Sequence, residues 1–150
     1  MKLRILPPLF GLLCALLMIG IAKLLPGLVF RFPGQNFAAA ALILSGLSMD
    51  IVALVQFRKQ QTTISPLSPQ KTAAIVKGGV FAISRNPMYL GMLLVLSGFG
   101  IYLGSIANLA ILAGFVAVIT RQQIKPEEEV LREKFGDEYT AYTNAVRRWI

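Results

Sequence analysis

The stretch RNPMYLG, residues 85–91, opens a run of uncharged residues that lasts until Arg121. This run of about 35 residues is too long for one membrane-spanning helix of about 20 residues, but it is long enough for two short ones. The pair Gly104-Ser105 is the turn-like place within it, so we divide the run there. Such a hairpin brings both ends of the run to one membrane face. Polar residues at the two ends are therefore expected to meet.

The composition is that of a membrane protein, because 55% of the residues are hydrophobic and only 15% are charged. The stretches 5–22 and 32–57 are also nearly free of charge, and Asp50 interrupts the second. We predict one all-α domain over residues 1–150, an integral membrane bundle of about four transmembrane helices with a C-terminal amphipathic interfacial helix. The predicted spans are approximately 5–25, 35–57, 86–103 and 105–122, with a cytoplasmic loop over 58–85 and a cytoplasmic tail over 123–150.

The positions of lysine and arginine predict the orientation. They gather before the first span, in the loop after the second and after the fourth, while Lys23 and Arg31 fall on the other side. Because cytoplasmic segments retain positive charge, both termini and the site are expected on the cytoplasmic side. The net charge of +8 is scattered around the membrane ends, so it suits anionic lipid headgroups rather than nucleic acid.

Two residue types restrict the possible chemistry. Cys14 is the single cysteine, and the chain has no histidine. A disulfide framework, a thiolate metal site and imidazole-dependent catalysis are therefore excluded, and we expect no metal.

The segments on either side of the hairpin have their own signals. Pro66 and Pro69 interrupt the loop before the hairpin, which is long enough for a lid, and Gly78-Gly79 permits a sharp turn near its end. After the hairpin, Pro126 followed by Glu127–Glu129 is typical of a helix start. Apolar and aromatic residues then recur at spacings of three and four, which predicts an amphipathic helix bent at Gly136.

Four motifs follow one another in the C-terminal half: Gly79-Val80-Phe81, the run from Ser84 to Gly91, the pattern from Glu127 to Tyr142, and Val146-x-Arg148. In order and spacing they resemble the isoprenylcysteine carboxyl methyltransferase and phospholipid methyltransferase superfamily of integral-membrane enzymes. The family commonly has histidine where this chain has Asn86, although asparagine also occurs there. Asn86 forms hydrogen bonds but does not titrate near neutral pH.

The resemblance implies S-adenosylmethionine as the methyl donor, with S-adenosylhomocysteine as its product. Glu127 and Glu128 would bind the ribose hydroxyls or the ammonium group of the donor. Arg85 would be the catalytic residue, holding the donor carboxylate or an anionic acceptor. Arg148 is a candidate substrate residue. The other cofactor-binding candidates are Gly79, Asn86, Pro87, Tyr89, Leu90 and Gly91.

Methyl transfer suits this set of residues for a physical reason. A methyl sulfonium is already activated, so an enzyme mainly aligns donor and acceptor and excludes water, an effect of about 7–11 kcal/mol. Neither a metal nor a histidine is required.

Asp50 is a second candidate substrate residue, because an acid inside an apolar span usually faces the bundle interior and has a partner. Arg58 and Arg85 are candidate partners. Two roles are therefore open for Asp50, a structural ion pair and a role in the cavity of the site.

Several of these residues also have plain structural interpretations. Arg85 and Asn86 suit a membrane anchor and a helix cap, and Glu127–Glu129, above all Glu129, suit a helix N-terminus. The Gly98-x-Gly100 pattern indicates helix packing, because no strand precedes it. Packing or interfacial anchoring is the alternative for Tyr139, Tyr142, Arg147, Arg148 and Trp149.

We therefore expect S-adenosylmethionine-dependent methyl transfer to a lipophilic acceptor, with membrane lipids as partners. A carboxylate acceptor, as in isoprenylcysteine methylation, needs no base. An amine, as in phospholipid N-methylation, needs one from Asp50, a glutamate, a tyrosine or water. The alternatives are a non-catalytic membrane adaptor that binds anionic lipids and a family member that has lost turnover. The acceptor and the oligomeric state are not determined by the sequence.

Overall fold

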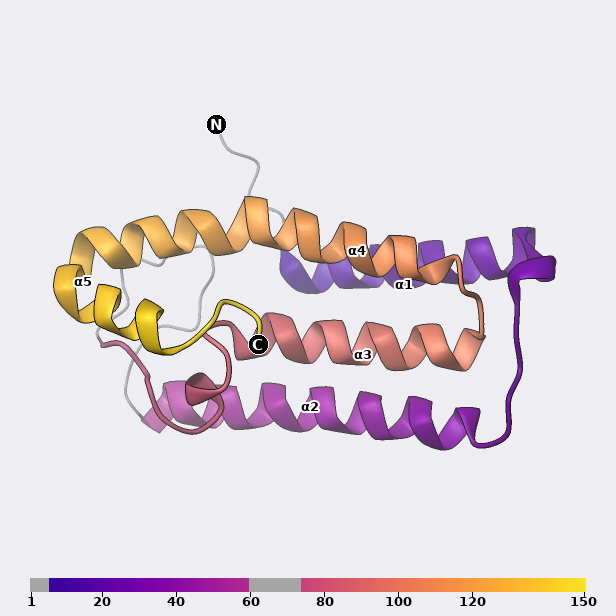
Figure 1. Ribbon diagram of the computed structural model, residues 1–150, viewed down its shortest axis with the longest axis horizontal. Coiled ribbons are helices and arrows are strands. Elements are labelled where there is room, and N and C mark those ends of the chain that lie inside the picture. The colour runs from indigo at the N-terminus through magenta and orange to yellow at the C-terminus, as the bar shows by residue number, and fades with distance from the viewer. Residues whose placement is uncertain (1–5, 60–73) are drawn as a thin grey trace.

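The computed structural model describes residues 6–59 and 74–150, and within these residues it contains no β-strand (Figure 1). The predicted all-α class is confirmed. Expectations that concern Lys2, Arg4, Pro66 and Pro69 lie outside the described residues. The helices are α1 (Pro7–Leu24), α2 (Gln35–Lys59), α3 (Pro87–Leu103), α4 (Asn108–Ile119) and α5 (Lys125–Ala145), with short turns η1 (Pro26–Leu28), η3 (Gly79–Ala82) and η4 (Thr120–Ile124).

Helix α3 is the centre of the bundle and packs against α1, α2 and α4. In Figure 1, α2 lies along one side of α3, and α1 and α4 lie along the other. Helix α4 continues through η4 into α5, which bends back towards the end at which α3 begins. The bend lies at Gly136, whose φ of 49° and ψ of −120° are not helical, so the predicted bend is confirmed.

Small residues seven positions apart bring α2 and α3 into backbone contact. They are Ala39, Gly46 and Ala53 on α2, and Gly91 and Gly98 on α3. A Cβ added at Gly46 would lie 2.5 Å from the carbonyl oxygen of Gly91, and one added at Gly98 would lie 2.6 Å from that of Ala39. A seven-residue repeat keeps one face of each helix against its neighbour. Close packing of this kind joins helices where lipid removes the hydrophobic driving force between them.

The end of α3 is tied to the beginning of α2. Gly104 ends α3 with a φ of 73°, and its carbonyl accepts a 2.8 Å hydrogen bond from the backbone of Phe30. The Gln35 amide donates to the carbonyls of Ile101 at 2.6 Å and Tyr102 at 3.0 Å. These bonds satisfy carbonyls that a helix end leaves unpaired. They fix the distal end of the bundle, and Gly104 makes the turn predicted there.

Two of the described helices, α1 and α2, are long and apolar enough to cross a membrane. Only 17% of the most apolar 18-residue window of each is buried inside the protein, unlike the core helix of a soluble protein. Large apolar side chains point outwards from both, among them Leu9 and Leu12 on α1 and Phe37 and Leu44 on α2. An apolar outer surface of this extent indicates lipid as the surrounding solvent.

Gly46→Ala should destabilise the bundle, because the new methyl group overlaps the α3 backbone and cannot be relieved by a side-chain rotation. We expect a loss of about 1–3 kcal/mol, the usual cost of overpacking. The measurement is thermal unfolding in detergent. Gly114→Ala in α4 is the matched control, since nothing lies within 4 Å of its Cβ position. Equal stability of the two variants would contradict the backbone contact described above.

Candidate functional site

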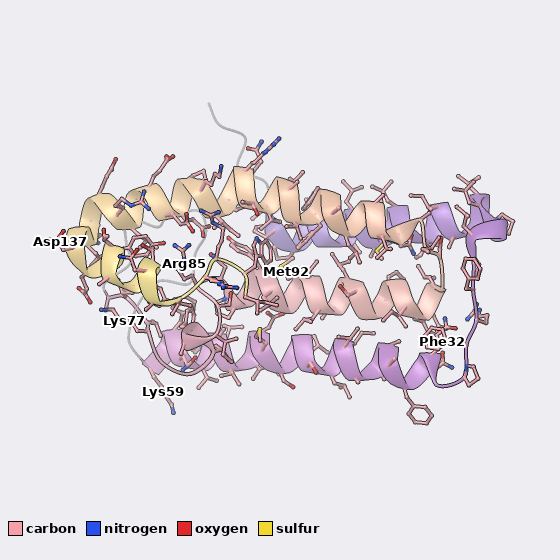
Figure 2. The ribbon with its side chains drawn as sticks, viewed as in Figure 1. Phe32, Lys59, Lys77, Arg85, Met92 and Asp137 are labelled. Atoms are coloured by element: carbon pink, nitrogen blue, oxygen red, sulfur yellow. The ribbon has the colours of Figure 1, made fainter. Side chains whose placement is uncertain are left out.

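A buried carboxylate and two arginines form an ion cluster at the end of the bundle where α3 begins. Glu128 Oε1 lies 3.1 Å from Arg85 Nη1. Arg148 donates from Nε to Glu128 Oε1 at 2.9 Å and from Nη2 to Oε2 at 2.8 Å. The Glu128 side chain is 8% exposed and that of Arg85 10%. Figure 2 shows Arg85 between α5 and the beginning of α3. The structure therefore brings three of the predicted site residues into direct contact.

A second contact joins the two ends of the hairpin. The buried Tyr89, in the first turn of α3, donates a 2.8 Å hydrogen bond to Glu127 Oε1. The neighbouring glutamates thus have different partners, because Glu127 accepts from a phenol while Glu128 binds guanidinium groups. The expectation that the hairpin ends meet is confirmed.

The last residues of the chain, 146–150, complete this region, and we call them the C-terminal strap. The carbonyl of Arg148 accepts hydrogen bonds from Asn86 Nδ2 at 3.0 Å and Ser84 Oγ at 3.3 Å. The carbonyl of Arg147 accepts one from the backbone N–H of Arg85 at 3.1 Å. Arg147 and Arg148 of this segment thus contact the RNPMYLG segment and the serine before it, while interfacial anchoring of the segment stays a prediction.

Trp149 attaches the strap to the fourth helix. Its indole Nε1 donates a 3.1 Å hydrogen bond to Thr120 Oγ1, and its ring packs against the main apolar cluster of the bundle. Thr120 is the first residue of η4, a π-helical turn that was not among the predicted elements. The available signal was Pro126, because proline inside a helix clashes with the carbonyl four residues earlier, here Gln122 within the π turn.

The π turn determines which side of the helix the two glutamates face. One extra residue in a helix rotates everything after it by about 100° relative to what precedes it. Helix α5 begins at Lys125, close to the predicted start, but it follows η4 without a break, since Ile124 has helical backbone angles. Glu127 and Glu128 therefore serve their side-chain partners rather than a free helix N-terminus.

Two buried tyrosines line the same region from α5. Tyr142 donates a 2.7 Å hydrogen bond to the carbonyl of Phe81, and Tyr139 contacts Arg85. Burial raises the pKa of Tyr139, and the charge of Glu128 raises it further, against the opposing effect of Arg85. Burial also raises the pKa of Tyr142 above its ordinary value. Both phenols stay neutral near pH 7 and pack as predicted, so neither is suited to act as a base.

The predicted glycines of the site face α2 rather than the ion cluster. A Cβ at Gly91 would collide with the carboxylate of Asp50, and one at Gly79 would collide with the amide of Gln56. Gly79 has a φ of 59° and begins η3, as the predicted sharp turn requires. Their contacts with a donor stay predictions, as do those of Pro87 and Leu90, which are buried in the first turn of α3.

Asp50 is not in an ion pair with Arg58 or Arg85 in the described part of the chain. Arg85 binds Glu128 instead, and Asp50 Oδ1 is buried without a hydrogen-bond partner. The structural ion pair considered for Asp50 is therefore not observed, and a role in a cavity stays a prediction.

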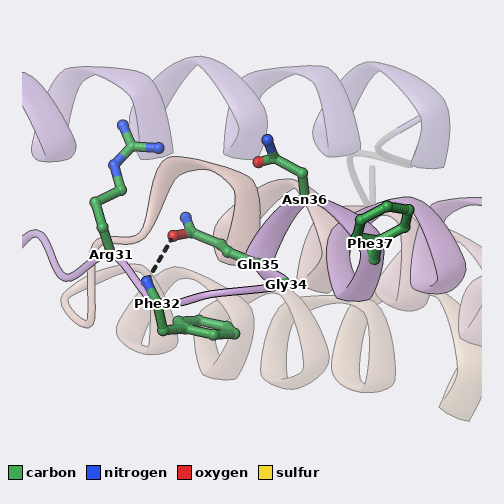
Figure 3. Close-up of a pocket in the computed structure, with 6 residues that line it drawn as sticks. All are labelled: Arg31, Phe32, Gly34, Gln35, Asn36 and Phe37. Atoms are coloured by element: carbon green, nitrogen blue, oxygen red, sulfur yellow. Dashed lines mark hydrogen bonds between the residues drawn. The ribbon is translucent and has the colours of Figure 1, made fainter.

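A separate hollow of about 280 Å³ lies at the other end of the molecule (Figure 3). Phe32, labelled in Figure 2, marks that end, opposite Arg85. Within the hollow the backbone N–H of Phe32 donates to Gln35 Oε1 at 3.3 Å. The lining residues are Arg31, Phe32, Gly34, Gln35, Asn36 and Phe37.

Comparison with known proteins identifies the class to which this fold and site belong. Residues 35–138 match the family described as phospholipid methyltransferase. This match covers more than half of the chain, which therefore belongs to that family of the membrane methyltransferase superfamily. An uncharacterized protein of Haemophilus influenzae is 47% identical over 64 residues, which are 42% of this chain and 100% of that protein. No solved structure matches the chain.

Glu128→Gln should release the C-terminal strap, because it removes the charge that holds Arg85 and Arg148. Removing one partner of a buried pair costs about 3–5 kcal/mol. Trp149 is the only tryptophan in the chain, so its fluorescence should shift to longer wavelength as it leaves the apolar cluster. Glu129→Gln, at an exposed position, is the matched control. An unchanged emission spectrum in Glu128→Gln would mean that the ion cluster does not hold the strap.

Proposed function

We propose that this protein transfers a methyl group from S-adenosylmethionine to a lipid acceptor at the cytoplasmic face of a membrane. The observation that carries the proposal is the convergence of Arg85, Tyr89, Glu127 and Glu128 at one end of the bundle. Family membership supports methyl transfer, and the distribution of lysine and arginine supports the cytoplasmic orientation.

The residues present fit the proposed donor. S-adenosylmethionine carries a ribose diol and an ammonium group, which suit the carboxylates of Glu127 and Glu128. Its carboxylate suits Arg85, whose buried Nε has no hydrogen-bond partner in the described residues. Two arginines share one glutamate here, so the cluster holds a positive charge that the donor carboxylate would balance.

When bound, the donor supplies an activated methyl group, and the chain supplies position and shelter from water. Tyr89 holds Glu127 in place through its hydroxyl group, and Glu128 is held by both arginines. The C-terminal strap lies across the beginning of α3 and closes the region on that side. Positioned groups of this kind lower the barrier by reducing the entropy lost on the way to the transition state.

For the acceptor, we propose an amine in a phospholipid headgroup. The family description supports a phospholipid. In this proposal Arg85 binds the donor carboxylate, so it does not hold an acceptor carboxylate as well. A carboxylate of the isoprenylcysteine type is the second candidate. The resemblance of the RNPMYLG segment and the absence of histidine favour it, since that reaction needs no base.

Tyr89→Phe should weaken S-adenosylhomocysteine binding about tenfold, because Glu127 loses its hydrogen-bond donor and a bond to a charged group is worth about 1.5–3 kcal/mol. Isothermal titration calorimetry in detergent measures the affinity. Tyr102→Phe, at an exposed position near the far end of α3, is the matched control and should bind as the wild type does. Unchanged affinity in Tyr89→Phe would remove this contact from the donor site.

Incubation with isotope-labelled donor and a membrane lipid extract tests the reaction and separates the acceptors. An N-methylated headgroup survives mild alkali, whereas a methyl ester is hydrolysed, and mass spectrometry distinguishes the two. We expect the alkali-stable product. Donor binding without any labelled lipid would indicate a family member that has lost turnover, and well-folded protein that binds no S-adenosylhomocysteine would indicate the membrane adaptor.

A further inference from the structure

Asp50 stands on the packed face of α2. The same face carries three other residues at helical spacing, Gly46, Ala53 and Phe57. Gly46 packs against the α3 backbone, Ala53 lies in an apolar cluster, and the Phe57 ring packs against that of Phe81 in η3. A carboxylate in this row is the exception. It lies nine residues before Lys59, about 13 Å from the end of the helix.

The neighbouring helix leaves space for this carboxylate. Any side chain at Gly91 would overlap Asp50 Oδ1, so α3 accommodates the acid through a missing side chain. Oδ1 is buried and has no hydrogen-bond partner, while the residue as a whole is partly exposed. One oxygen of the carboxylate is therefore enclosed by the protein, while part of the residue remains exposed.

A carboxylate oxygen that is buried without a hydrogen bond is costly, which makes Asp50 a candidate ligand-binding group. The ion pairs formed by the described residues involve Arg85, Arg148 and Lys77, and all of them use other acids. Among the described residues, the contacts with this face come from Met88, Gly91 and Val95 of α3 and from Phe81 of η3, and none of these four residues is titratable. A cation from outside the described residues would compensate this carboxylate.

We propose that Asp50 binds the ammonium group of the acceptor phospholipid and removes its proton before methyl transfer. This inference rests on the proposed function and assigns the acceptor side of the same reaction. Gly91 follows the RNPMYLG proline by one helical turn, so Asp50 lies within a turn of the segment that carries Arg85 and Asn86.

The reaction balances with Asp50 as the base. The ammonium group gives one proton to the carboxylate and becomes a neutral amine. The nitrogen lone pair then forms a bond to the methyl carbon as the carbon–sulfur bond breaks, and that electron pair stays on sulfur. The products are an N-methyl ammonium lipid, S-adenosylhomocysteine and protonated Asp50, which returns its proton to water at the interface.

The other candidate bases are less suited to this step. The chain has no histidine, and Tyr139 and Tyr142 stay protonated. Glu128 is paired with two arginines, and Glu127 accepts the Tyr89 hydroxyl.

Asp50→Asn tests the inference with full-length protein in vesicles of phosphatidylethanolamine and phosphatidylcholine. The variant should bind S-adenosylhomocysteine as the wild type does, because Asp50 is outside the donor cluster. Its kcat should fall by about 100-fold or more, the usual effect of removing a general base. Its rate should then rise about tenfold per pH unit as alkali supplies free amine, whereas the wild-type rate should not. Ser45→Ala, at an exposed position on α2, is the control and should behave as the wild type.

A second readout does not depend on turnover. Native mass spectrometry from mixed micelles should show about tenfold less phosphatidylethanolamine retained by Asp50→Asn than by the wild type, with equal retention of phosphatidylglycerol. The inference would be overturned if Asp50→Asn kept turnover near the wild-type level. It would also be overturned if the variant lost turnover without alkaline rescue and with unchanged lipid retention. Either result would leave the donor site intact. Failure of the wild type to bind S-adenosylhomocysteine would overturn the proposed function itself.

Discussion

The carboxylate of Glu128 holds together three segments that are far apart in the sequence. It belongs to α5, and it binds Arg85 just before the beginning of α3 and Arg148 in the C-terminal strap. A buried charge is tolerated only when it is paired and hydrogen-bonded, so the loss of any one member leaves the others uncompensated. Because lipid-facing helices gain little from burying apolar surface against one another, a polar cluster of this kind sets how the ends of the bundle assemble.

The π turn at η4 allows this cluster to form. It changes the phase of the helix between the apolar part of α4 and the acidic start of α5, and Trp149 is bonded to its first residue. Pro126 gives the physical reason for a turn at this place, since its ring is incompatible with a regular α-helix through Gln122. The extra residue rotates Glu127 and Glu128 together relative to α4, and their adjacent positions on α5 then give them different partners.

The two sides of α3 differ in their electrostatics. On one side Glu127 and Glu128 are hydrogen-bonded and paired, which suits them to hold a polar ligand in a fixed geometry. On the other side Asp50 is tucked against Gly91 without a cation from the described residues. Methyl transfer to an amine needs both environments, one that positions the donor and one that accepts a proton. The contact of Gly91 with α2 therefore links the packing of the bundle to the proposed chemistry.

Charge-free stretches and the turn at Gly104 were sufficient to predict the helices, the hairpin and the meeting of its two ends, where Arg85 contacts Glu128 and Tyr89 contacts Glu127. Span length and turn chemistry are local properties. The bend at Gly136 and the packing role of Gly98 followed from the same kind of signal. Only the tertiary structure decided how α5 is rotated relative to α4 and how Trp149 docks on Thr120. It also decided that Gly79 and Gly91 face α2 and that Asp50 is separate from both candidate arginines. Those features depend on helix rotation and on contacts between distant residues, which periodicity along one chain does not specify.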